Sequence, residues 1–411
     1  MAIASVVHLQ QGLVVVGSLM LTAYLFPEQT TVTDCEEVDI VIVGAGSAGS
    51  VLADRLSECA HCDVMAIDAG DDPPIESLLP SLFTYLPGTR SDWNFTSAPD
   101  NRTAQEHTTG ALNLTQGHVL GGGSSVNYMM YVRGCDEDFE SWASAAKDSS
   151  WNYEGVYPYF LKSERLEDPN IFNSHYRYFH GTTGFLGVTR ENRKDVQKYL
   201  DAFQEIGHET IFDINGEKKL GYTPVLYTIA NGVRQTTALT NLGRAKERLN
   251  LRVLKRTLVI EILFDKNNKA IGVRAITENN RIITIKVRKE VIVSAGAINT
   301  PKLLFLSGIG PKEHLQSMNI PVRSDLPVGL NFQDHVMVFF AIKLEESNST
   351  IPPSDPYEFP IPIFAGYASL NKSDTCPKYQ VFNFIVPHDS ETPYQLCTYN
   401  SGIKESICRK L

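Results

Sequence analysis

Apolar residues along this chain form short, unbroken runs that alternate with glycine-rich turns and longer polar stretches. The first clear run is Val38–Val43, in which only Asp39 is polar. Such a run predicts a strand that is buried on both faces, as the strands of a parallel sheet are. Apolar positions at helical spacing follow over Val51–Leu56, and a second apolar strand is predicted at Val64–Ile67.

The turn between the first strand and the helix has the composition of a dinucleotide-binding corner, Gly44-Ala45-Gly46-Ser47-Ala48-Gly49. Gly44 permits a tight turn, Gly46 lets the backbone approach a pyrophosphate, and Gly49 lets the helix pack closely on the strand. The phosphates would lie on the free N–H groups of the helix N-terminus. Asp68, which precedes Ala69 and lies 24 residues after Gly44, can accept both ribose hydroxyls of an adenosine. This order of elements predicts a dinucleotide site without separating FAD from NAD.

A second glycine-bearing stretch, Gly117–Gly134, narrows the choice of nucleotide. Three glycines followed by two serines leave backbone N–H groups accessible to phosphate or flavin oxygens. Asn127 offers both a donor and an acceptor, which suits the edge of an isoalloxazine ring. The apolar run Tyr128–Val132 follows at once and favours burial over an ordinary surface loop.

These residues resemble the signatures of a known family. Gly117–Asn127 resembles the first signature of the glucose–methanol–choline (GMC) oxidoreductases, flavoenzymes that oxidise alcohols. Ser294–Pro311 resembles the second signature of that family, and Leu326–His335 is similar to the motif that follows it. The resemblance extends in the expected order from about Val38 and implies FAD as the cofactor.

The resemblance also implies where FAD would be bound. Flavin contacts are expected in two segments. In the first signature the expected residues are Val119, Gly122, Asn127, Tyr128, Met129 and Met130. In the glycine turn of the second signature they are Ala295 and Gly296. Val259 matches a position that meets the adenine through its backbone. In some relatives the residue before the asparagine is a histidine bonded covalently to the flavin. Here that residue is Val126, which has no nucleophile, so we predict non-covalent FAD.

The predicted fold class is α/β, with a doubly wound, Rossmann-like FAD-binding domain interleaved with a sheet-based substrate domain. The FAD-binding domain is expected to be discontinuous, over residues 34–150 and 236–334. The substrate-binding domain is expected over residues 151–235 and 335–411, and family members complete both domains with a further C-terminal stretch.

Other patterns predict the remaining elements. Three antiparallel strands are expected at Val253–Phe264, Ala270–Thr277 and Ile282–Val287, with a separate buried strand at Glu290–Ser294 that leads into a glycine turn and a helix. Two further strands are expected, at Met337–Leu344 and Tyr379–Val386.

Three longer regions differ from the rest in composition and predict other kinds of structure. Residues 71–110 are rich in Pro, Asp, Thr and Asn and predict a long irregular excursion, of the kind that covers a site. Trp142–Leu166 carries aromatic residues at helical spacing, which we assign to the core. Residues 181–232 predict short strand segments.

The N-terminal residues suggest export. Gly12–Phe26 is an apolar run of 15 residues, too short to span a bilayer comfortably and typical of a signal peptide, which we place at residues 1–26. No Lys or Arg precedes it, so a signal anchor and a buried N-terminal segment stay open as alternatives. Five Asn-x-Ser/Thr sequons support a secreted, extracellular glycoprotein: Asn94, Asn101, Asn113, Asn348 and Asn371.

Net charge bears on the possible binding partners, and the cysteines bear on disulfides and metal sites. A net charge of −10 argues against nucleic acid or an acidic membrane surface as a partner. Seven cysteines are present, and the Cys59-x-x-Cys62 pair could be a redox pair or half of a metal site. A structural disulfide or two free thiols fits better, because no second such pair is present, and we expect no metal site. Cys397 and Cys408 could pair with each other or with partners elsewhere.

Oxidation of an alcohol through a flavin needs a base that takes the hydroxyl proton while a hydride moves to the flavin. In the family that this chain resembles, that base is a histidine in the C-terminal portion, and the sequence ends at Leu411. His335 is the best histidine present, but the same criteria favour a structural hydrogen-bonding role for it. We therefore assign no catalytic residue and expect a C-terminally truncated chain that is inactive as it stands.

The leading functional hypothesis is an FAD-dependent oxidoreductase that oxidises a CH–OH group to a carbonyl. The segment Trp151–Phe160 resembles the insect-type branch, which includes ecdysone oxidases and quinone-linked glucose dehydrogenases. The resemblance implies a small-molecule alcohol as substrate, either a steroid or a sugar, and oxygen or a quinone as electron acceptor. The alternatives are a non-catalytic truncated isoform and an NAD-dependent dehydrogenase.

Overall fold

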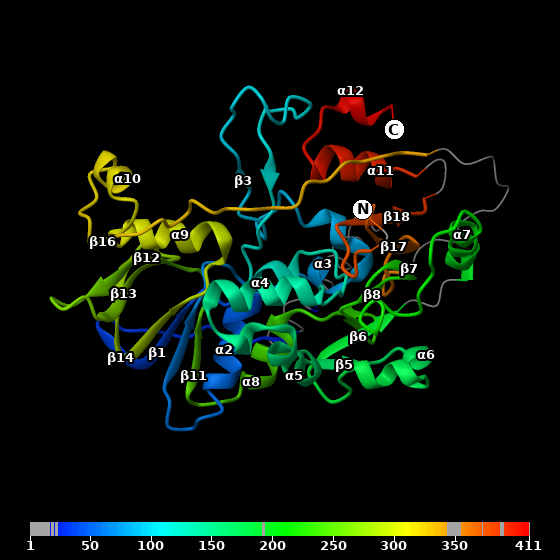
Figure 1. Cartoon of the computed structure of the whole chain (residues 1–411). Helices are drawn as coiled ribbons and strands as arrows, with labels where there is room; N and C mark the ends of the chain where they lie inside the picture. The colour runs from blue at the N-terminus through cyan, green and yellow to red at the C-terminus, as the bar shows by residue number, and fades with distance from the viewer. Residues whose placement is uncertain are drawn as a thin grey trace, which may run out of the picture.

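The chain builds two groups of β-sheets that lie side by side, joined by helices and by long connections (Figure 1). This computed structural model describes residues 24–190, 194–342, 355–371, 373–386 and 390–410, together with positions 17 and 20. One group is a six-stranded sheet, and the other contains two sheets of three strands each.

The six-stranded sheet has the order β11-β2-β1-β14-β13-β12. Its strands are β1 (Glu36–Val43), β2 (Val64–Ile67), β11 (Leu251–Leu254), β12 (Thr257–Phe264), β13 (Ala270–Thr277) and β14 (Ile282–Val293). The first four strands in that order are parallel, and β14, β13 and β12 form an antiparallel meander. Helix α2 (Ser47–Leu56) follows β1, and helix α9 (Gly296–Leu306) follows β14.

Helices cover both faces of this sheet. Ile40 and Ile42 of β1 pack in one apolar cluster with Ala53 of α2, while Val41 of the same strand packs in a second cluster with Leu303 of α9. Alternate residues of one strand thus face opposite layers, which explains why Val38–Val43 is apolar at almost every position. The predicted doubly wound, Rossmann-like α/β class is confirmed.

Two predictions about the meander were wrong in detail. The expected first strand, Val253–Phe264, is divided into β11 and β12 at Arg256, which has a φ of +51°. The separate strand expected from Glu290 is instead the second half of β14. A bulge in the pairing of β1 with β14 lies opposite Asp39, and the predicted break between Val287 and Glu290 falls on this bulge.

The second group of sheets contains the strands expected around residues 181–232 and 379–386. One sheet has the order β18-β17-β7, and the other consists of β5, β6 and β8. Their bounds are β5 (Glu164–Leu166), β6 (Leu186–Arg190), β7 (Gly221–Pro224), β8 (Leu226–Tyr227), β17 (Ile363–Ala368) and β18 (Tyr379–Phe384). A further helix, α7 (Lys194–Glu205), lies where only strands were predicted, and its apolar residues Val196 and Leu200 pack on Tyr222 and Phe364.

Two more predictions fail in this part of the chain. The described portion of the expected strand Met337–Leu344, residues 337–342, is extended but belongs to no sheet, and its side chains lie exposed; positions 343 and 344 are outside the described residues. Trp142, Trp151 and Tyr159 were assigned to the core but are about half or more exposed. Trp142 instead stacks edge-on against Trp151 and the buried Phe139, so the aromatic cluster forms at the surface.

The remaining elements are short, apart from α4 and α5. The helices are α3 (Ile75–Leu78), α4 (Asp136–Ala146), α5 (Tyr153–Ser163), α6 (Pro169–Phe172), α8 (Gly243–Ala245), α10 (Lys312–Ser317), α11 (Thr392–Gln395) and α12 (Glu405–Cys408). The 3-10 and π segments are η1 (Pro80–Tyr85), η2 (Gly122–Ser125), η3 (Ser149–Trp151), η4 (His175–Phe179), η5 (Ala238–Leu242) and η6 (Leu396–Asn400). The two-residue strands are β3 (Phe95–Thr96), β4 (Asn113–Leu114), β9 (Ile229–Ala230), β10 (Val233–Arg234), β15 (Ile309–Gly310) and β16 (Ser324–Asp325).

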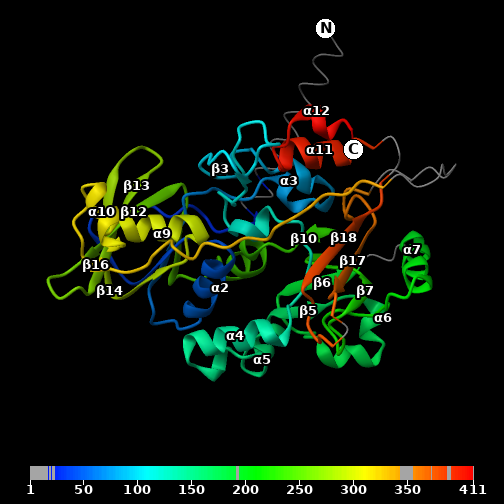
Figure 2. The same cartoon turned by 45° about the horizontal axis from the view of Figure 1, so that its top comes forward.

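The excursion predicted over residues 71–110 is present and rises from the body beside α11 and α12 in both views (Figure 1 and Figure 2). It is tied there by backbone hydrogen bonds from Thr108 N to Gly402 O at 2.9 Å and from Lys404 N to Glu106 O at 2.9 Å. The four described sequon asparagines, at 94, 101, 113 and 371, are all exposed. Asn348 lies outside the described residues.

Cysteine pairing resolves the alternatives that the sequence left open. Cys397 and Cys408 form a local disulfide, and Cys59 and Cys62 are free thiols. A second disulfide, Cys135–Cys376, was not predicted, because its cysteines are 241 positions apart. Among the described residues, no group of three His, Cys, Asp or Glu side chains is arranged to hold a metal ion.

Most of the predicted signal peptide, residues 1–26, lies outside the described residues. Of its described positions, Phe26 is buried in the same core cluster as Ile40 and Leu242. In the part of the chain that the structure describes, no helix has both the length and the apolar character to cross a bilayer.

Candidate nucleotide-binding site

The two glycine corners that the sequence singled out lie in direct contact, although about 75 residues separate them. The N–H of Gly121 donates to the carbonyl oxygen of Ala45 at 2.9 Å, and Ser47 Oγ donates to the carbonyl oxygen of Gly121 at 3.3 Å. Gly122 has a φ of +51°, and a Cβ added there would lie 2.8 Å from the Cα of Gly46. Only glycine at position 122 therefore allows the two corners to meet without a shift.

The first corner has the geometry that its glycines predict. Gly44 has a φ of +92°, and a Cβ on Gly49 would lie 1.9 Å from the carbonyl oxygen of Gly44. Helix α2 begins with Gly46 as its N-cap residue, and no side chain caps the helix. The first turn, at Ser47 and Ala48, is exposed, so its free N–H groups and the helix dipole can receive a phosphate.

Asp68 lies where the sequence placed it, directly after β2, and it also supports the corner. Its carboxylate accepts hydrogen bonds from Ala45 N and from Gly70 N, each at 2.7 Å. Burial raises the pKa of Asp68 above its ordinary value, against the opposing effect of these two N–H donors. An ionised carboxylate has about four acceptor positions, so capacity for a ribose hydroxyl remains. Ala69 is half-buried beside it.

The second glycine-bearing stretch, Gly117–Gly134, contacts the first corner with its earlier residues and packs in the core with its later ones. Asn127 is exposed, and its Oδ1 accepts from Met129 N at 3.1 Å. Met129 has a φ of +61°, and its side chain is fully buried in the core of the second group of sheets, with Tyr128 and Met130 packed against the same cluster. Val119 is likewise buried. The segment thus turns from the corner into the core directly after Asn127.

A third glycine turn, between β14 and α9, meets the first corner from the other side. Ser294 Oγ donates to the carbonyl oxygen of Gly44 at 2.8 Å, and Ser294 N donates to Val43 O at 2.8 Å. Ala295 is half-buried, whereas Gly296 is exposed and has a φ of +86°. The first and third turns therefore follow the carboxyl ends of the neighbouring parallel strands β1 and β14, where nucleotides bind in such sheets, and the second stretch contacts the first turn.

Val259, the residue that the resemblance matches to an adenine contact, lies in β12 rather than in a glycine turn. It is buried near the beginning of β12 and pairs with Ala275. The preceding backbone is attached to the segment after β2, because Thr257 N donates to Asp68 O at 2.9 Å and Arg256 N donates to Gly70 O at 2.9 Å.

Two residues at this site were missed from the sequence. Arg234 is fully buried; its Nη1 donates to Asn127 O at 2.6 Å and to Asn127 Oδ1 at 2.8 Å. Thr237 N donates to Ser124 Oγ at 3.0 Å and holds the glycine–serine segment. The sequence offered no signal for either residue, because both reach partners more than 100 positions away.

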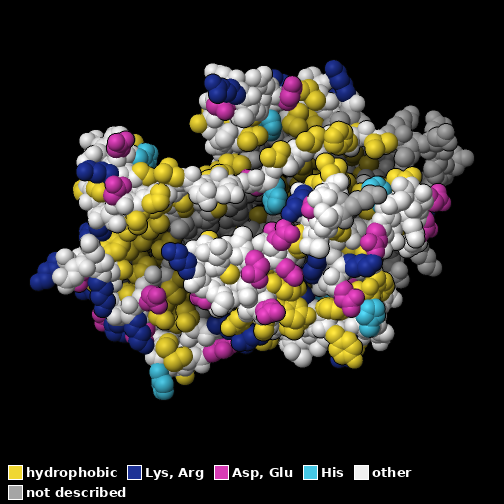
Figure 3. Space-filling model, viewed as in Figure 1, with side chains coloured by type: hydrophobic (Ala, Val, Ile, Leu, Met, Phe, Trp, Pro, Cys, Tyr) yellow, Lys and Arg dark blue, Asp and Glu magenta, His cyan; other side chains and the backbone are white. Residues whose placement is uncertain are grey.

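His335 gives no sign of a catalytic role. It lies on the exposed, extended segment that follows α10, and its backbone N–H donates to Asp334 Oδ1 at 2.7 Å. Figure 3 shows apolar side chains gathered along this segment, with a hollow beneath it between α9 and α4. The exposed apolar residues of the segment are Val336, Met337, Val338, Phe339, Phe340 and Ile342.

These features fit FAD. An uncapped, exposed helix N-terminus suits the pyrophosphate, Asp68 has acceptor capacity for the ribose, and the backbone at Gly123 and Asn127 is exposed. A Cβ added to Gly123 would meet no atom within 4 Å, so the backbone there is open to a ligand.

Comparisons with known proteins agree with this geometry. A GMC oxidoreductase family model matches residues 38–337. An ecdysone oxidase from Bombyx mori is 36% identical over 94% of this chain and 59% of its own length. A glucose dehydrogenase (FAD, quinone) from Drosophila melanogaster is 36% identical over 76% of this chain and 50% of its own length. A solved FAD-dependent oxidoreductase from Chaetomium thermophilum has a TM-score of 0.63 and 30% identity, covering 71% of this chain and 51% of that chain. This chain thus spans half to three fifths of these three proteins.

Proposed function

Because the chain belongs to the GMC oxidoreductases, we propose that it forms the flavin-binding part of an enzyme that oxidises a CH–OH group to a carbonyl. FAD is its cofactor. When bound, the flavin accepts the hydride that leaves the alcohol carbon. The close approach of Gly122 to Gly46 carries this proposal, because one cofactor can contact both glycine corners only if they are adjacent.

The residues that we propose for FAD fall into three groups. The backbone of the first corner holds the pyrophosphate, Asp68 and Ala69 with the backbone of Val259 hold the adenosine, and the other two turns with the segment after them hold the flavin. The full proposed set is Gly44, Ala45, Gly46, Ser47, Ala48, Gly49, Asp68, Ala69, Val119, Gly122, Asn127, Tyr128, Met129, Met130, Val259, Ala295 and Gly296. Binding is non-covalent, because Val126 offers no nucleophile at the position of the histidyl linkage.

The proposed domains follow the two groups of sheets. Residues 34–150 and 236–334 form the FAD-binding domain around the six-stranded sheet, and residues 151–235 and 335–411 contribute to the substrate-binding domain. No catalytic base is assigned within this chain. Its own residues bind the cofactor, orient it through Asn127 and the glycine turns, and exclude water with the apolar core below Tyr128.

A steroid hydroxyl is the first substrate to test, with a sugar hydroxyl as the second. The similarity to ecdysone oxidase extends over 94% of this chain, against 76% for the glucose dehydrogenase, and so includes more of the proposed substrate-binding domain. Oxygen and a quinone are the proposed electron acceptors. A secreted location is proposed from the apolar run at 12–26, the exposed sequons and the two disulfides.

Absorbance spectroscopy of the purified chain tests the cofactor proposal. We expect the two visible bands of oxidised flavin and release of FAD on denaturation without a covalent flavin peptide. A colourless protein that binds NAD instead would contradict the proposal. Dye-reduction assays with ecdysone-type steroids and with glucose then identify the alcohol, and a protein that oxidises neither would contradict the proposed substrates.

A further inference from the structure

Cys59 and Cys62 lie at the opposite end of α2 from the nucleotide-binding corner, in the turn that leads into β2. Their Sγ atoms are 2.8 Å apart. The N–H of Cys62 donates to the carbonyl oxygen of Cys59 at 2.9 Å, which closes a β-turn around the two intervening residues. Because unbonded sulfur atoms do not normally approach so closely, the turn already holds the two thiols in reach of a bond to each other.

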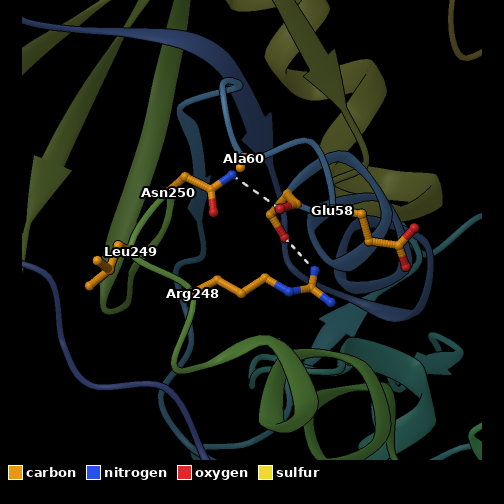
Figure 4. Close-up of a pocket in the computed structure, with 6 residues that line it drawn as sticks. Glu58, Ala60, Arg248, Leu249 and Asn250 are labelled. Atoms are coloured by element: carbon orange, nitrogen blue, oxygen red, sulfur yellow. Dashed lines mark hydrogen bonds between the residues drawn. The ribbon is translucent and has the colours of Figure 1, made fainter.

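Asn250, which directly precedes β11, holds the turn through its side-chain amide. Its Nδ2 lies 3.1 Å from the carbonyl oxygen of Ser57 and 2.9 Å from those of both Cys59 and Cys62. Arg248 Nη1 adds a hydrogen bond to Ser57 Oγ at 2.8 Å (Figure 4). A surface pocket beside the turn is lined by Ser57, Glu58, Ala60, Arg248, Leu249 and Asn250. A small molecule can therefore reach the turn while its backbone stays fixed.

The two thiols differ in surroundings. Cys59 is exposed and Cys62 is half-buried. The Cys62 thiol donates to Cys59 Sγ, which lowers the pKa of Cys59 below its ordinary value, and the backbone N–H of His61 acts in the same direction. Lys289 Nζ lies 4.0 Å from Cys62 Sγ and also contacts Asp39 at 3.2 Å. Cys59 is thus both the more accessible of the two thiols and the one whose pKa is lowered, as in dithiols that exchange with disulfides.

We propose that Cys59 and Cys62 form a thiol–disulfide exchange site that is separate from the flavin site and reacts with small disulfide compounds. The Cys59 thiolate attacks one sulfur of a disulfide R–S–S–R, the S–S bond breaks, and one R–S⁻ leaves. Cys62 then loses its proton to solvent, its thiolate attacks Cys59 Sγ, and the second R–S⁻ leaves. The compound is reduced to two thiols, the pair is oxidised to a Cys59–Cys62 bond, and an excess of thiol reverses both steps.

The two disulfides of the protein are less accessible to solvent than this pair of thiols. The four cysteines of Cys135–Cys376 and Cys397–Cys408 are all buried, so solvent thiols reach them poorly. A bond between Cys59 and Cys62 closes a loop of only two intervening residues, so it constrains the unfolded chain little. Exchange therefore explains the exposed, clamped pair better than a stabilising role.

A redox titration of the flavin-loaded protein tests the proposal. The protein is equilibrated at a series of ratios of reduced to oxidised glutathione, quenched with acid, alkylated and digested for mass spectrometry. We expect the peptide with Cys59 and Cys62 to change between dithiol and disulfide with a single midpoint inside the series, while the two buried disulfides stay intact. A pair that stays reduced at every ratio, or oxidised at every ratio, would overturn the proposal.

Single variants test the order of attack. Cys62→Ser should accumulate a mixed disulfide between Cys59 and glutathione, and Cys59→Ser should react with oxidised glutathione about tenfold more slowly than Cys62→Ser. Equal rates for the two variants would contradict the assignment of Cys59 as the attacking residue. Cys35→Ser, which removes the third free thiol, is the matched control and should leave the midpoint unchanged. Unchanged flavin absorbance in each variant reports that the fold is intact.

Discussion

Arg234 donates from Nη1 to two oxygens of Asn127, the backbone oxygen at 2.6 Å and the side-chain Oδ1 at 2.8 Å. Nε of the same guanidinium donates to Ser77 O at 2.6 Å. Met129 N also donates to Asn127 Oδ1, so the oxygen of this amide is occupied and its exposed Nδ2 is left to donate. Arg234 therefore fixes the orientation of the Asn127 amide, the group that we propose for the flavin.

Replacing Arg234 should weaken FAD binding. Arg234 is fully buried, no carboxylate pairs with it among the described residues, and burial lowers its pKa to about 9. Arg234→Met removes the charged donor and releases Asn127; a hydrogen bond to a charged group contributes about 1.5–3 kcal/mol, so FAD affinity should fall by about ten- to a hundredfold. Fluorescence titration of the apoprotein with FAD measures this loss.

Two controls separate positioning from loss of fold. Arg234→Lys keeps the charge and a single donor nitrogen, so it should recover part of the affinity, and the shape of its flavin absorbance band should approach that of the parent. Arg281→Met removes an exposed arginine and should change neither affinity nor spectrum. An Arg234→Met protein that binds FAD as tightly as the parent would show that Asn127 keeps its orientation without the guanidinium.

Gly122→Ala should separate the two glycine corners. A Cβ at this position would lie 2.8 Å from Gly46 Cα, and the residue has a φ of +51°, so alanine is strained in both respects. Strain of about 1–3 kcal/mol in a site that must close around the cofactor should reduce FAD affinity about tenfold or more. Gly207→Ala is the matched control, because Gly207 follows α7 outside the proposed site, has a positive φ of +92°, and a Cβ there would meet nothing within 4 Å. Equal FAD affinity in the two variants would contradict the proposed contact.

The first corner could be predicted from the sequence because its determinants are local. The apolar run at Val38–Val43 fixes a strand that both layers cover, and the positive φ at Gly44 and the close approach at Gly49 each require glycine at a set position. The meeting of this corner with Gly122 followed only from the resemblance to a flavoenzyme family. Composition and spacing do not encode that contact, because about 75 residues separate its sides.

Other features could not be predicted because they depend on distant contacts. Arg234 is a charged residue in the interior, and its Asn127 partner lies 107 positions away. The bulge opposite Asp39 lets β14 continue through a stretch that carries Arg288 and Lys289, where a polar interruption suggested a strand end. Residues 337–342 have the apolar character of a strand, but no described strand pairs with them.

The buried His180 should make stability depend on pH. Its Nδ1 lies 2.7 Å from Glu164 and its Nε2 lies 2.7 Å from Asp213, while Arg133 also pairs with Glu164. Burial opposes the charged imidazole, but the hydrogen bonds to Asp213 and Glu164 outweigh burial and raise the pKa of His180. A raised pKa in the folded state means that the stabilisation is complete below about pH 6.5, the unfolded value, and is lost as the pH rises through the folded-state pKa.

Urea unfolding of the parent and of His180→Gln across pH 6 to 9 measures this contribution. Removing one member of a buried charge network costs about 3–5 kcal/mol, so the variant should be less stable at pH 6, and the difference should shrink toward pH 9. The exposed His314→Gln should leave the pH profile unchanged. A constant difference at every pH would mean that His180 is neutral in the folded protein.

The Cys135–Cys376 disulfide should stabilise the arrangement of the two groups of sheets. Cys135 directly precedes α4, just after the flavin signature, and Cys376 lies between β17 and β18. The bond spans 241 positions, so in the chain-entropy model its loss costs more than loss of the local Cys397–Cys408 bond, which spans 11. Replacing Cys135 and Cys376 together with Ala should lower the unfolding free energy by about 2–5 kcal/mol. The same replacement at Cys397 and Cys408 is the control, and it should cost less; equal losses would show that native packing rather than loop closure sets the contribution of each disulfide.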